Sequence, residues 1–541
     1  MSQAYNMGDY EKEYADFKWE IPEKFNFARD VIDKWAEDPQ KLAMKWVNDE
    51  GLEKDVTFAD FSLRSRKLAN VLAGLGVGRG DVVMVMLGRD LEWWDVFTAC
   101  IRMGALISPG TTQLSAKDIA YRIETAGVSC FITDNANASK LEAIEKEVPK
   151  LKGKIVIGEP RKGWRFYDDE LAGAPEAFAA ADTRSDEDSI VYFTSGTTGY
   201  PKMALHTHGY GLAHQTTGRY WIDLKPSDLH WNVSDTGWAK AAWSSYFGPW
   251  NCGAALFTHC TDRFDPVKTL ELLERYPITT MCGAPTIYRT LVLQDLSKYR
   301  FPVLRHCVGA GEPLNPEVIE VWKRATGTVI RDGYGQTETV ILCGSWPCIE
   351  PRFGSMGKPA PGIDLQVIDD ELNIVPPGTE GNIAIRVNPE RPAGLFKEYW
   401  KDPDKTASTY RGDWYLTGDK AYRDEDGYFW FVSRSDDLII SSGYRIGPFE
   451  VESALIEHPA VAESAVVASP DEQRGEVVKA FIILAPGHTA SDDLLKELQD
   501  HVKSVTAPYK YPRKIEFVDA LPKTISGKIR RIELRDKEWG K

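Results

Sequence analysis

The sequence predicts an α/β protein with a large N-terminal domain of layered sheets and helices, followed by a small α+β domain. The chain has 541 residues, far more than one ordinary domain needs, and 43% of them are hydrophobic. From residue 57 onward, runs rich in β-branched residues alternate with runs of helical period, which is typical of mostly parallel sheets covered on both faces. A polar run at 433–437 interrupts this alternation, and we expect it to separate domain 1–435 from domain 436–541.

The spacing of apolar residues assigns the elements in chain order. Residues 1–50 are charged and aromatic, and we expect them to cover the domain without contributing chemistry. Beyond them, helices are predicted at 58–75 and 91–103, and strands at 82–87, 130–133, 155–157 and 189–193. In the second domain, helices are predicted at 449–457 and 492–505, and strands at 462–468, 477–484 and 514–518.

Composition limits the partners and the compartment. Lys and Arg number 65 against 80 Asp and Glu, a net charge of −15, so nucleic acid and anionic membranes are not expected as partners. The cysteines are scattered, which favours free thiols in a reducing environment. No apolar run is long enough to span a membrane, and the N-terminus shows no signal-peptide progression. We therefore expect a cytoplasmic protein without a membrane span, as a monomer or a homodimer.

A loop with the composition of a phosphate site follows the strand at 189–193. Its glycines let the backbone bend close to an anion, its hydroxyls and free amides donate hydrogen bonds, and its lysine adds a positive charge. A polar surface turn is the alternative interpretation. The candidate phosphate-binding residues are Thr194, Ser195, Gly196, Thr197, Thr198, Gly199 and Lys202.

Two further stretches and one aspartate have nucleotide-binding chemistry. Small residues at 309–313 would let a flat purine ring lie against the backbone. The segment 332–338 offers a stackable ring, amide and hydroxyl donors and a carboxylate, which are the groups needed to hold adenine, a reacting phosphate and Mg²⁺. Asp419 follows an apolar strand, where a carboxylate can accept hydrogen bonds from both ribose hydroxyls. The candidates in the two stretches are Gly311, Glu312, Pro313, Asp332, Gly333, Tyr334, Gly335, Gln336, Thr337 and Glu338.

Two features between these motifs leave alternatives open. His206 and His208 form a His-x-His pair, but no third ligand follows at a suitable spacing, so we expect structural packing rather than metal binding. Aromatic residues crowd the stretch 230–250, where they form core or wall an apolar pocket for an acyl tail.

The second domain carries two basic sites. Lys528 ends a glycine-containing loop, from which a cation can reach a carboxylate and an α-phosphate together. A glycine-pinched strand at 442–448 leaves room for a narrow chain such as pantetheine. Arg434, near the domain boundary, is suited to bridge nucleotide hydroxyls or phosphate. For each basic residue, a solvated surface charge is the alternative. The candidates for coenzyme A binding are Ser442, Gly443, Tyr444, Arg445, Arg474, Tyr511 and Arg513.

These motifs, in this order, resemble those of the adenylate-forming superfamily, which includes acyl- and aryl-CoA synthetases, peptide-synthetase adenylation domains and firefly luciferase. The resemblance begins with the string TSGTTGYPK at 194–202 and extends over nearly the whole chain. The run 442–467 and the string KYPRKIEF at 510–517 are most similar to the medium-chain acyl-CoA synthetase branch. The resemblance implies the adenylate-forming enzyme fold with a mobile C-terminal domain. It also implies that ATP, Mg²⁺ and coenzyme A are used, with no tightly bound organic cofactor.

The resemblance further implies residue roles at the nucleotide. By resemblance, Gln113 touches the nucleotide, Tyr334 stacks on adenine and Thr337 contacts the α-phosphate. Glu338 helps to hold the metal, with Thr197 as a second candidate.

For the acid and the domain motion, the resemblance implies that Trp238 lines the acyl pocket, with Gly309 and Gly311 as further candidates. Lys528 is implied as a catalytic residue and Asp436 as the pivot of the small domain. The chain departs from the wider superfamily at Ser433, where glycine is usual.

The implied reaction is AMP-forming ligation of a carboxylic acid to coenzyme A, with a short- or medium-chain or branched fatty acid as the expected substrate. An aryl- or cyclic-acid ligase of the benzoate type, a luciferase-like oxygenase and a catalytically silent nucleotide-binding regulator are the alternatives. The string ending at Lys528 resembles one in which lysine acetylation silences relatives, which makes an acetyltransferase and a deacetylase candidate partners.

Overall fold

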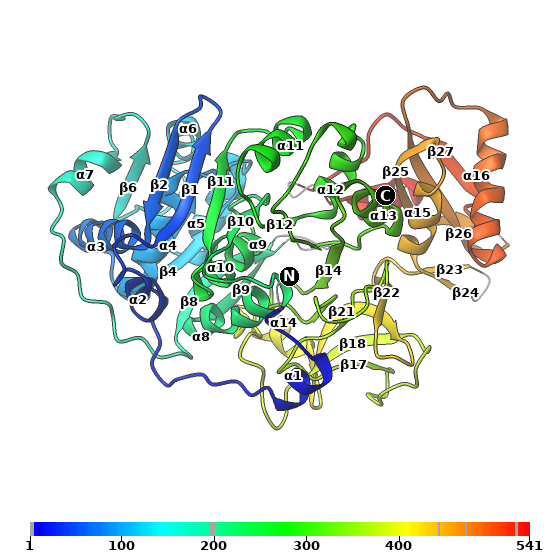
Figure 1. Ribbon diagram of the computed structural model, residues 1–541, viewed down its shortest axis with the longest axis horizontal. Helices are drawn as coiled ribbons and strands as arrows, with labels where there is room; N and C mark the ends of the chain where they lie inside the picture. Colours follow the sequence, from blue (N-terminus) through cyan, green and yellow to red (C-terminus); the bar gives the residue numbers. More distant parts are fainter. Residues whose placement is uncertain (1–4, 195–200, 442–443, 472, 525–527, 541) are drawn as a thin grey trace.

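The computed structural model describes residues 5–194, 201–441, 444–471, 473–524 and 528–540. Figure 1 shows a large N-terminal part, coloured blue to yellow, and a smaller C-terminal part, coloured orange to red, beside it. The sheets of the large part share a hydrophobic core, since Val83, Leu256 and Ile383, from different sheets, belong to one cluster of buried side chains. The N-terminal part is therefore one layered body.

The first sheet is mixed and carries the predicted phosphate loop. β3 pairs in parallel with β4 and β5, whereas β8 and β9 form an antiparallel hairpin. In spatial order its strands are β19 (Glu398–Tyr399), β9 (Lys202–Thr207), β8 (Asp188–Thr194), β4 (Leu106–Pro109), β3 (Val82–Met86), β5 (Val128–Asp134), β6 (Gly153–Ile157) and β7 (Arg165–Phe166).

The second sheet is parallel from β14 to β1. The carboxyl ends of these strands meet at one edge, the position at which α/β sheets bind ligands. In spatial order the strands are β16 (Lys358–Pro359), β15 (Cys343–Gly344), β14 (Ile330–Tyr334), β13 (His306–Ala310), β12 (Thr280–Gly283), β10 (Leu229–Asn232), β11 (Ala255–Cys260), β1 (Leu42–Asn48) and β2 (Glu53–Thr57).

Helices fill the space beside these sheets. In α4 every residue except Glu92 is buried, so this helix is part of the core. A capping box between Thr57 and Asp60 begins α3, and Gly127 in the left-handed conformation ends α5. The principal helices of the large part are α3 (Phe58–Gly74), α4 (Leu91–Met103), α5 (Ala116–Ala126), α6 (Asn135–Glu142), α7 (Tyr167–Gly173), α8 (His208–Ala213), α9 (Ala239–Ala242), α11 (Pro266–Arg275), α12 (Pro285–Val292), α13 (Pro316–Thr326) and α14 (Pro403–Ser408).

A third, antiparallel sheet completes the large part, and the mostly parallel pattern expected from the sequence does not extend to it. Here β21 runs through Asp419, so the expectation that the strand ends before this residue is wrong. The register of β21 with β18 shifts near this point, and Gly418, with φ of 78°, lets the strand continue past the shift. The strands are β17 (Leu365–Ile368), β18 (Gly381–Arg386), β21 (Trp414–Arg423) and β20 (Tyr410–Arg411), with β22 (Phe429–Arg434) paired to β21.

The C-terminal part is an α+β unit with its own core, in which Val451, Val466 and Leu498 belong to one cluster. The boundary at residue 436 stays a prediction. Its strands are β24 (Tyr444–Ile446), β23 (Ile439–Ser441), β26 (Gly475–Leu484), β25 (Val461–Asp471) and β27 (Lys514–Phe517), and its helices are α15 (Pro448–Ile456), α16 (Asp492–Val505) and α17 (Arg531–Glu538).

The first fifty residues do more than cover the domain. Tyr10 and Tyr14 donate hydrogen bonds to the carbonyls of Pro359 and Ile363, at 2.9 and 3.0 Å, as a covering segment should. However, β1 pairs in parallel with β11 inside the second sheet, so the expectation fails from residue 42 onward. Across the described ranges, no helix combines the length and the apolar character that crossing a membrane requires.

Candidate active site

The predicted phosphate loop connects the two strands of an antiparallel hairpin. β8 ends at Thr194 and β9 begins at Lys202, and these residues face each other in the register. A strand rather than a helix follows the loop, which distinguishes it from a common P-loop. The rest of the predicted loop lies outside the described residues: Ser195, Gly196, Thr197, Thr198 and Gly199.

One tyrosine links Lys202 to Glu338. The Tyr399 hydroxyl donates to Glu338 Oε1 at 2.7 Å, and Lys202 Nζ lies 5.5 Å from the centre of the Tyr399 ring. Glu338 is buried, and burial also lowers the pKa of Lys202. A single carboxylate suits Mg²⁺ that arrives on a triphosphate, because this ion takes most of its ligands from phosphates and water. In the part of the chain that the structure describes, no cluster of three or more His, Cys, Asp and Glu forms a protein-only metal site.

The backbone around Tyr334 is packed against two tryptophan rings. A Cβ at Gly333 would lie 2.5 Å from the Trp221 ring, and a Cβ at Gly335 would lie 2.4 Å from the Trp243 ring. Only glycine allows such an approach. This packing explains why glycine stands on both sides of the predicted adenine-stacking ring at the end of β14.

Tyr334, Gln336 and Asp419 form a hydrogen-bonded group between the second and third sheets. The Tyr334 hydroxyl donates to Asp419 Oδ2 at 2.6 Å, and Gln336 Nε2 donates to the same oxygen at 2.8 Å. Burial raises the pKa of Asp419, while the Tyr334 hydrogen bond and the charge of Arg434 oppose the rise. Arg434 faces Asp419 across β21 and β22 and donates to Asp436 Oδ1 at 3.0 Å. The predicted adenine, ribose and pivot residues therefore lie in one chain of contacts.

The segment after β13 leaves a strand that pairs in parallel with β14, the strand that ends at Tyr334. Gly311 has φ of 117°, a conformation that favours glycine, and Glu312 accepts a hydrogen bond from Arg289 at 2.6 Å. On the neighbouring strand, burial raises the pKa of Asp332 to about 7, although Gly333 N donates to its Oδ1 at 2.8 Å. Two further candidates stand beside Gly311, namely Gly309 and Pro313.

Lys240 joins the carboxyl ends of two parallel strands, and the sequence reasoning gave it no role. Its Nζ donates to the carbonyls of Gly283 on β12 and Ala310 at the end of β13, both at 2.7 Å. Burial lowers the pKa of this ammonium, and the charge of Glu312 is among those that oppose the shift. The only signal in the sequence was its place two residues after Trp238, because a single lysine is usually a surface charge.

Lys528 belongs to the small domain, but charges of the large domain act on its amine. Thr524 N donates to the Lys528 carbonyl at 2.7 Å, and the residues between them, 525–527, lie outside the described residues. Lys528 is exposed at the surface. Nearby protein atoms nevertheless displace part of the water around its amine, and this desolvation lowers its pKa. The negative charge of Glu312 acts most strongly against this shift, with those of Asp419 and Glu338. The amine is therefore within electrostatic reach of carboxylates on three separate segments of the large domain.

Trp238 and Gln113 belong to loops that touch across the first and second sheets. A Cβ at Gly237 would lie 2.2 Å from Thr111 N, so glycine is required where the loops meet. Trp238 is half-buried directly before α9, and Gln113 is exposed.

The predicted coenzyme A residues lie on the small domain, away from this site. Tyr444 stacks on Tyr509 with ring centres 4.4 Å apart, and Arg513 donates to the Tyr511 hydroxyl. Figure 1 shows β24, which carries Tyr444, well separated from β14. The remaining candidates are Arg445 on β24 and Arg474 between β25 and β26, with Ser442 and Gly443 outside the described residues.

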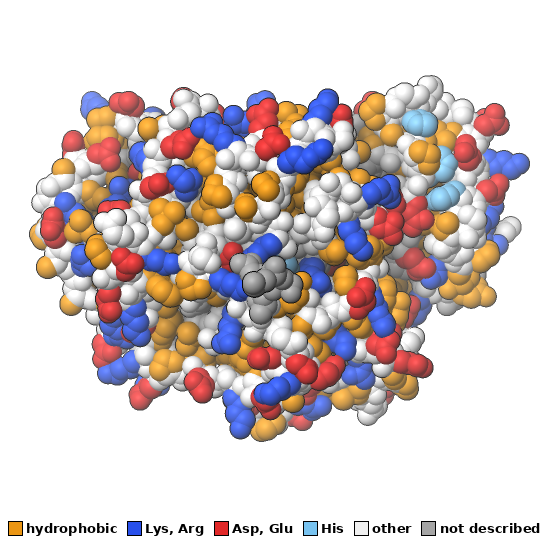
Figure 2. Space-filling model, in the orientation of Figure 1, with side chains coloured by type: hydrophobic (Ala, Val, Ile, Leu, Met, Phe, Trp, Pro, Cys, Tyr) orange, Lys and Arg blue, Asp and Glu red, His pale blue; other side chains and the backbone are white. Residues whose placement is uncertain are grey.

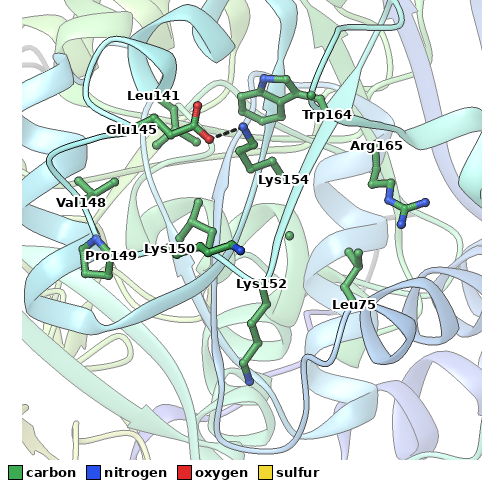
Figure 3. Close-up of a pocket in the computed structure, with 13 residues that line it drawn as sticks. Leu75, Leu141, Glu145, Val148, Pro149, Lys150, Lys152, Lys154, Trp164 and Arg165 are labelled. Carbon is green, nitrogen blue, oxygen red and sulfur yellow. Dashed lines mark hydrogen bonds and ion pairs between the residues drawn. The ribbon is translucent and has the colours of Figure 1, made fainter.

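The surface agrees with a local site rather than a broad charged face. Figure 2 shows acidic and basic side chains interspersed over the visible face. The predicted site residues themselves include three basic side chains, Lys202, Arg434 and Lys528. A pocket along β6 and β7 lies elsewhere (Figure 3), where Glu145 and Lys154 form an ion pair at 2.6 Å. None of the predicted site residues lines it.

Comparison with known proteins agrees with this geometry. Residues 32–400 match the AMP-binding enzyme family, and residues 450–528 match the AMP-binding enzyme C-terminal domain. The chain is 52% identical to mouse acyl-coenzyme A synthetase ACSM3, mitochondrial, over 99% of this chain and 94% of the relative. It is also 52% identical to human acyl-coenzyme A synthetase ACSM4, mitochondrial, over 96% and 91%. A crystal structure of an anthranilate CoA ligase with anthranoyl-AMP superposes with a TM-score of 0.89 at 33% identity, covering 96% of this chain and 98% of that one.

The fold is thus that of an adenylate-forming enzyme, and the chain belongs to the AMP-binding enzyme family. Within that family its similarity assigns it to the acyl-CoA synthetases, which are ligases. The resemblance, the fold class and the enzyme class predicted from the sequence are therefore confirmed.

The predicted cytoplasmic location is wrong in the light of these relatives. ACSM3 and ACSM4 are both named as mitochondrial proteins, which points to the mitochondrion rather than the cytoplasm. The physical reason for the error is that charge, hydropathy and free thiols report a reducing aqueous compartment, and both compartments are of that kind.

Proposed function

We propose that the protein ligates a short- or medium-chain or branched fatty acid to coenzyme A, using Mg·ATP. In the first step a carboxylate oxygen attacks the α-phosphorus, the bond to the β-phosphate breaks, and pyrophosphate leaves. In the second step the coenzyme A thiol loses its proton, its sulfur attacks the acyl carbonyl, and AMP leaves. The similarity to ACSM3 and ACSM4 over nearly the whole chain supports an aliphatic substrate.

The observation that carries the proposal is electrostatic: burial lowers the pKa of Lys528, and the charges of Glu312, Asp419 and Glu338 from the large domain oppose that shift. A cation at this position would neutralise the α-phosphate and the attacking carboxylate as they approach each other. Thr337 and the amides of the 194–199 loop would stabilise the same phosphate.

The remaining roles follow from the contacts around this point. Tyr334 would stack on adenine, and Asp419, already an acceptor for two donors, would turn its carboxylate to the ribose hydroxyls. Glu338, with Thr197, would hold the Mg²⁺ of the triphosphate. Trp238 would bound the acyl pocket, because an aromatic ring limits the depth of an apolar cavity.

The two steps require different positions of the small domain. Charges of the large domain, those of Glu312, Asp419 and Glu338, act on Lys528, whereas β24 lies apart from β14 (Figure 1), and this combination supports assigning the present arrangement to the first step. The second step needs a path for the coenzyme A thiol past Gly443. We propose that rotation about Asp436 brings Tyr444, Arg445, Arg474, Tyr511 and Arg513 into use for coenzyme A.

Acetylation of Lys528 is the proposed form of regulation, because it would remove the charge that the first step uses. A lysine acetyltransferase and a deacetylase are the proposed partners, and the proposed assembly is a monomer or a homodimer. An unchanged adenylation rate after stoichiometric acetylation of Lys528 would exclude this regulation.

The test is pyrophosphate release measured with a panel that contains butyrate, octanoate and benzoate. The proposal expects the aliphatic acids to give the higher kcat/KM. Faster release with benzoate would show an aryl-acid ligase instead. Failure to exchange pyrophosphate into ATP with any acid would show a silent nucleotide-binding regulator.

A further inference from the structure

His206 is a buried side chain beside the site that the reaction steps do not use. It lies on β9, is fully buried, and its Nε2 is 2.7 Å from the carbonyl oxygen of Thr337. A carbonyl only accepts hydrogen bonds, so Nε2 is the donor and the imidazole must carry its proton there. Burial lowers the pKa of His206 to about 3, which keeps the ring neutral and the donor in place at ordinary pH.

Burial of this imidazole satisfies only one of its two ring nitrogens. Its Nδ1 has no hydrogen-bond partner among the described residues and is shielded from solvent. The ring packs against Tyr210 with centres 3.8 Å apart, which fixes its orientation. Because an unpaired buried polar atom destabilises the fold, packing alone would favour an apolar side chain at this position.

The Thr337–Glu338 main chain is held at both carbonyls. His206 donates to the carbonyl of Thr337, and Phe396 N donates to the carbonyl of Glu338 at 2.7 Å. Two main-chain anchors leave the side chains of this pair free to be directed elsewhere. The Glu338 carboxylate is oriented separately by the Tyr399 hydroxyl.

The face of β9 that carries His206 also carries Lys202, the closing residue of the predicted phosphate loop. Side chains four residues apart on a strand point to the same side, so Lys202 and His206 share one face of β9. Lys202 lies over the ring of Tyr399, which holds Glu338, and His206 holds Thr337. One rigid strand thus connects the closing residue of the phosphate loop to both members of the pair.

We propose that His206 is a positioning residue for adenylation, which fixes the Thr337 main chain so that the Thr337 hydroxyl and the Glu338 carboxylate face the triphosphate. The inference rests on the proposed function, because the triphosphate is the substrate of that reaction. The group acts through Thr337 and touches no substrate itself.

The experiment compares three variants in pyrophosphate exchange and in equilibrium binding of Mg·ATP. His206→Ala removes the donor, and His206→Gln keeps a neutral N–H donor on a side chain of similar reach. His208→Ala is the matched control. His208 is also buried, but it is the first residue of α8, and its backbone N donates to the carbonyl of Glu187. Folded protein is quantified for each variant, so a loss of stability does not count as a loss of rate.

We expect His206→Ala to lower kcat of exchange by about 10- to 100-fold, the usual effect of removing a supporting contact behind a reacting group. His206→Gln should recover most of the rate, and His208→Ala should keep the wild-type kcat per folded molecule. A His206→Ala enzyme with wild-type kcat, or equal losses in His206→Ala and His208→Ala, would overturn the proposal. Absence of exchange in the wild-type enzyme would instead count against the proposed function; His206 is then judged by whether His206→Ala alone weakens Mg·ATP binding.

Discussion

The hydroxyl of Tyr334 donates to Asp419 Oδ2 at 2.6 Å, which joins the last residue of β14 to the middle of β21. These residues are 85 positions apart in the chain and belong to different sheets. The contact fixes the Tyr334 ring, which is predicted to stack on adenine, relative to the Asp419 carboxylate, which is predicted to bind ribose. It joins the second and third sheets at the proposed nucleotide site.

The first prediction separates the two partners of this contact. Asp419→Asn removes the charge that we propose binds the ribose hydroxyls, and we expect KM for ATP to rise by about tenfold or more, since hydrogen bonds to a charged group are worth about 1.5–3 kcal/mol. Tyr334→Phe keeps the ring, so its effect on KM should be smaller. Steady-state kinetics with ATP as the varied substrate measures both. A larger effect from Tyr334→Phe would show that the hydroxyl, rather than the carboxylate, binds the nucleotide.

The second prediction concerns the glycines beside Tyr334. Gly335→Ala places a Cβ 2.4 Å from the Trp243 ring, so the ring or the strand must move. We expect the free energy of unfolding to fall by about 1–3 kcal/mol, as for other overpacked cores. Gly173→Ala is the control, because nothing lies within 4 Å of its Cβ. Thermal denaturation of both variants gives the comparison, and equal melting temperatures would contradict the packing argument.

The third prediction follows from the raised pKa of Asp332. Burial brings this pKa to about 7 in the folded protein, whereas an unfolded aspartate titrates near 3.9. Between these values the folded protein keeps a proton that the unfolded chain releases, so stability falls as pH rises from about 4 to about 7. Asp332→Asn should remove this contribution. Chemical denaturation between pH 5 and pH 8 tests it, and parallel stability profiles for the variant and the wild type would refute the assignment.

The fourth prediction tests the pivot. Asp436→Pro fixes φ of this residue and should hinder rotation of the small domain. Because we assign the present arrangement, in which charges of the large domain act on Lys528, to the first step, we expect adenylation to remain and thioester formation from supplied acyl-adenylate to fall by more than tenfold. Ser435→Ala, next to the pivot, is the control. Equal rates of thioester formation in Asp436→Pro and the wild type would place the hinge elsewhere.

The parts of the fold with a strong local pattern were predicted from the sequence. The helix at 91–103 and the helix at 492–505 agree with α4 and α16, because apolar residues recur at helical spacing in both. The antiparallel third sheet was missed, since its strands contain polar residues such as Thr417 and Asp419 that look like turns when read singly. β1 was missed because the sequence around it is dominated by charged and aromatic residues.

The candidate site could be predicted as a set of motifs but not as a set of contacts. The sequence marked Tyr334 as a stackable ring, but only the fold shows that tryptophans from distant segments pack against the glycines on either side of it. Lys240 was given no role and His206 was assigned to structural packing, because both bind main-chain carbonyls that carry no residue-specific signal. The compartment was predicted wrongly because overall composition does not determine the subcellular location of a protein.

The most direct measurement of the account compares the two half-reactions in Lys528→Ala. We expect exchange of pyrophosphate into ATP to fall by at least about 100-fold, since a preorganised charge at the reacting phosphate is lost. Formation of acyl-CoA from supplied acyl-adenylate should proceed at close to the wild-type rate, because that step does not use this amine. Loss of both half-reactions, or normal pyrophosphate exchange, would contradict the claim that the C-terminal lysine and the loop after β8 act on one triphosphate.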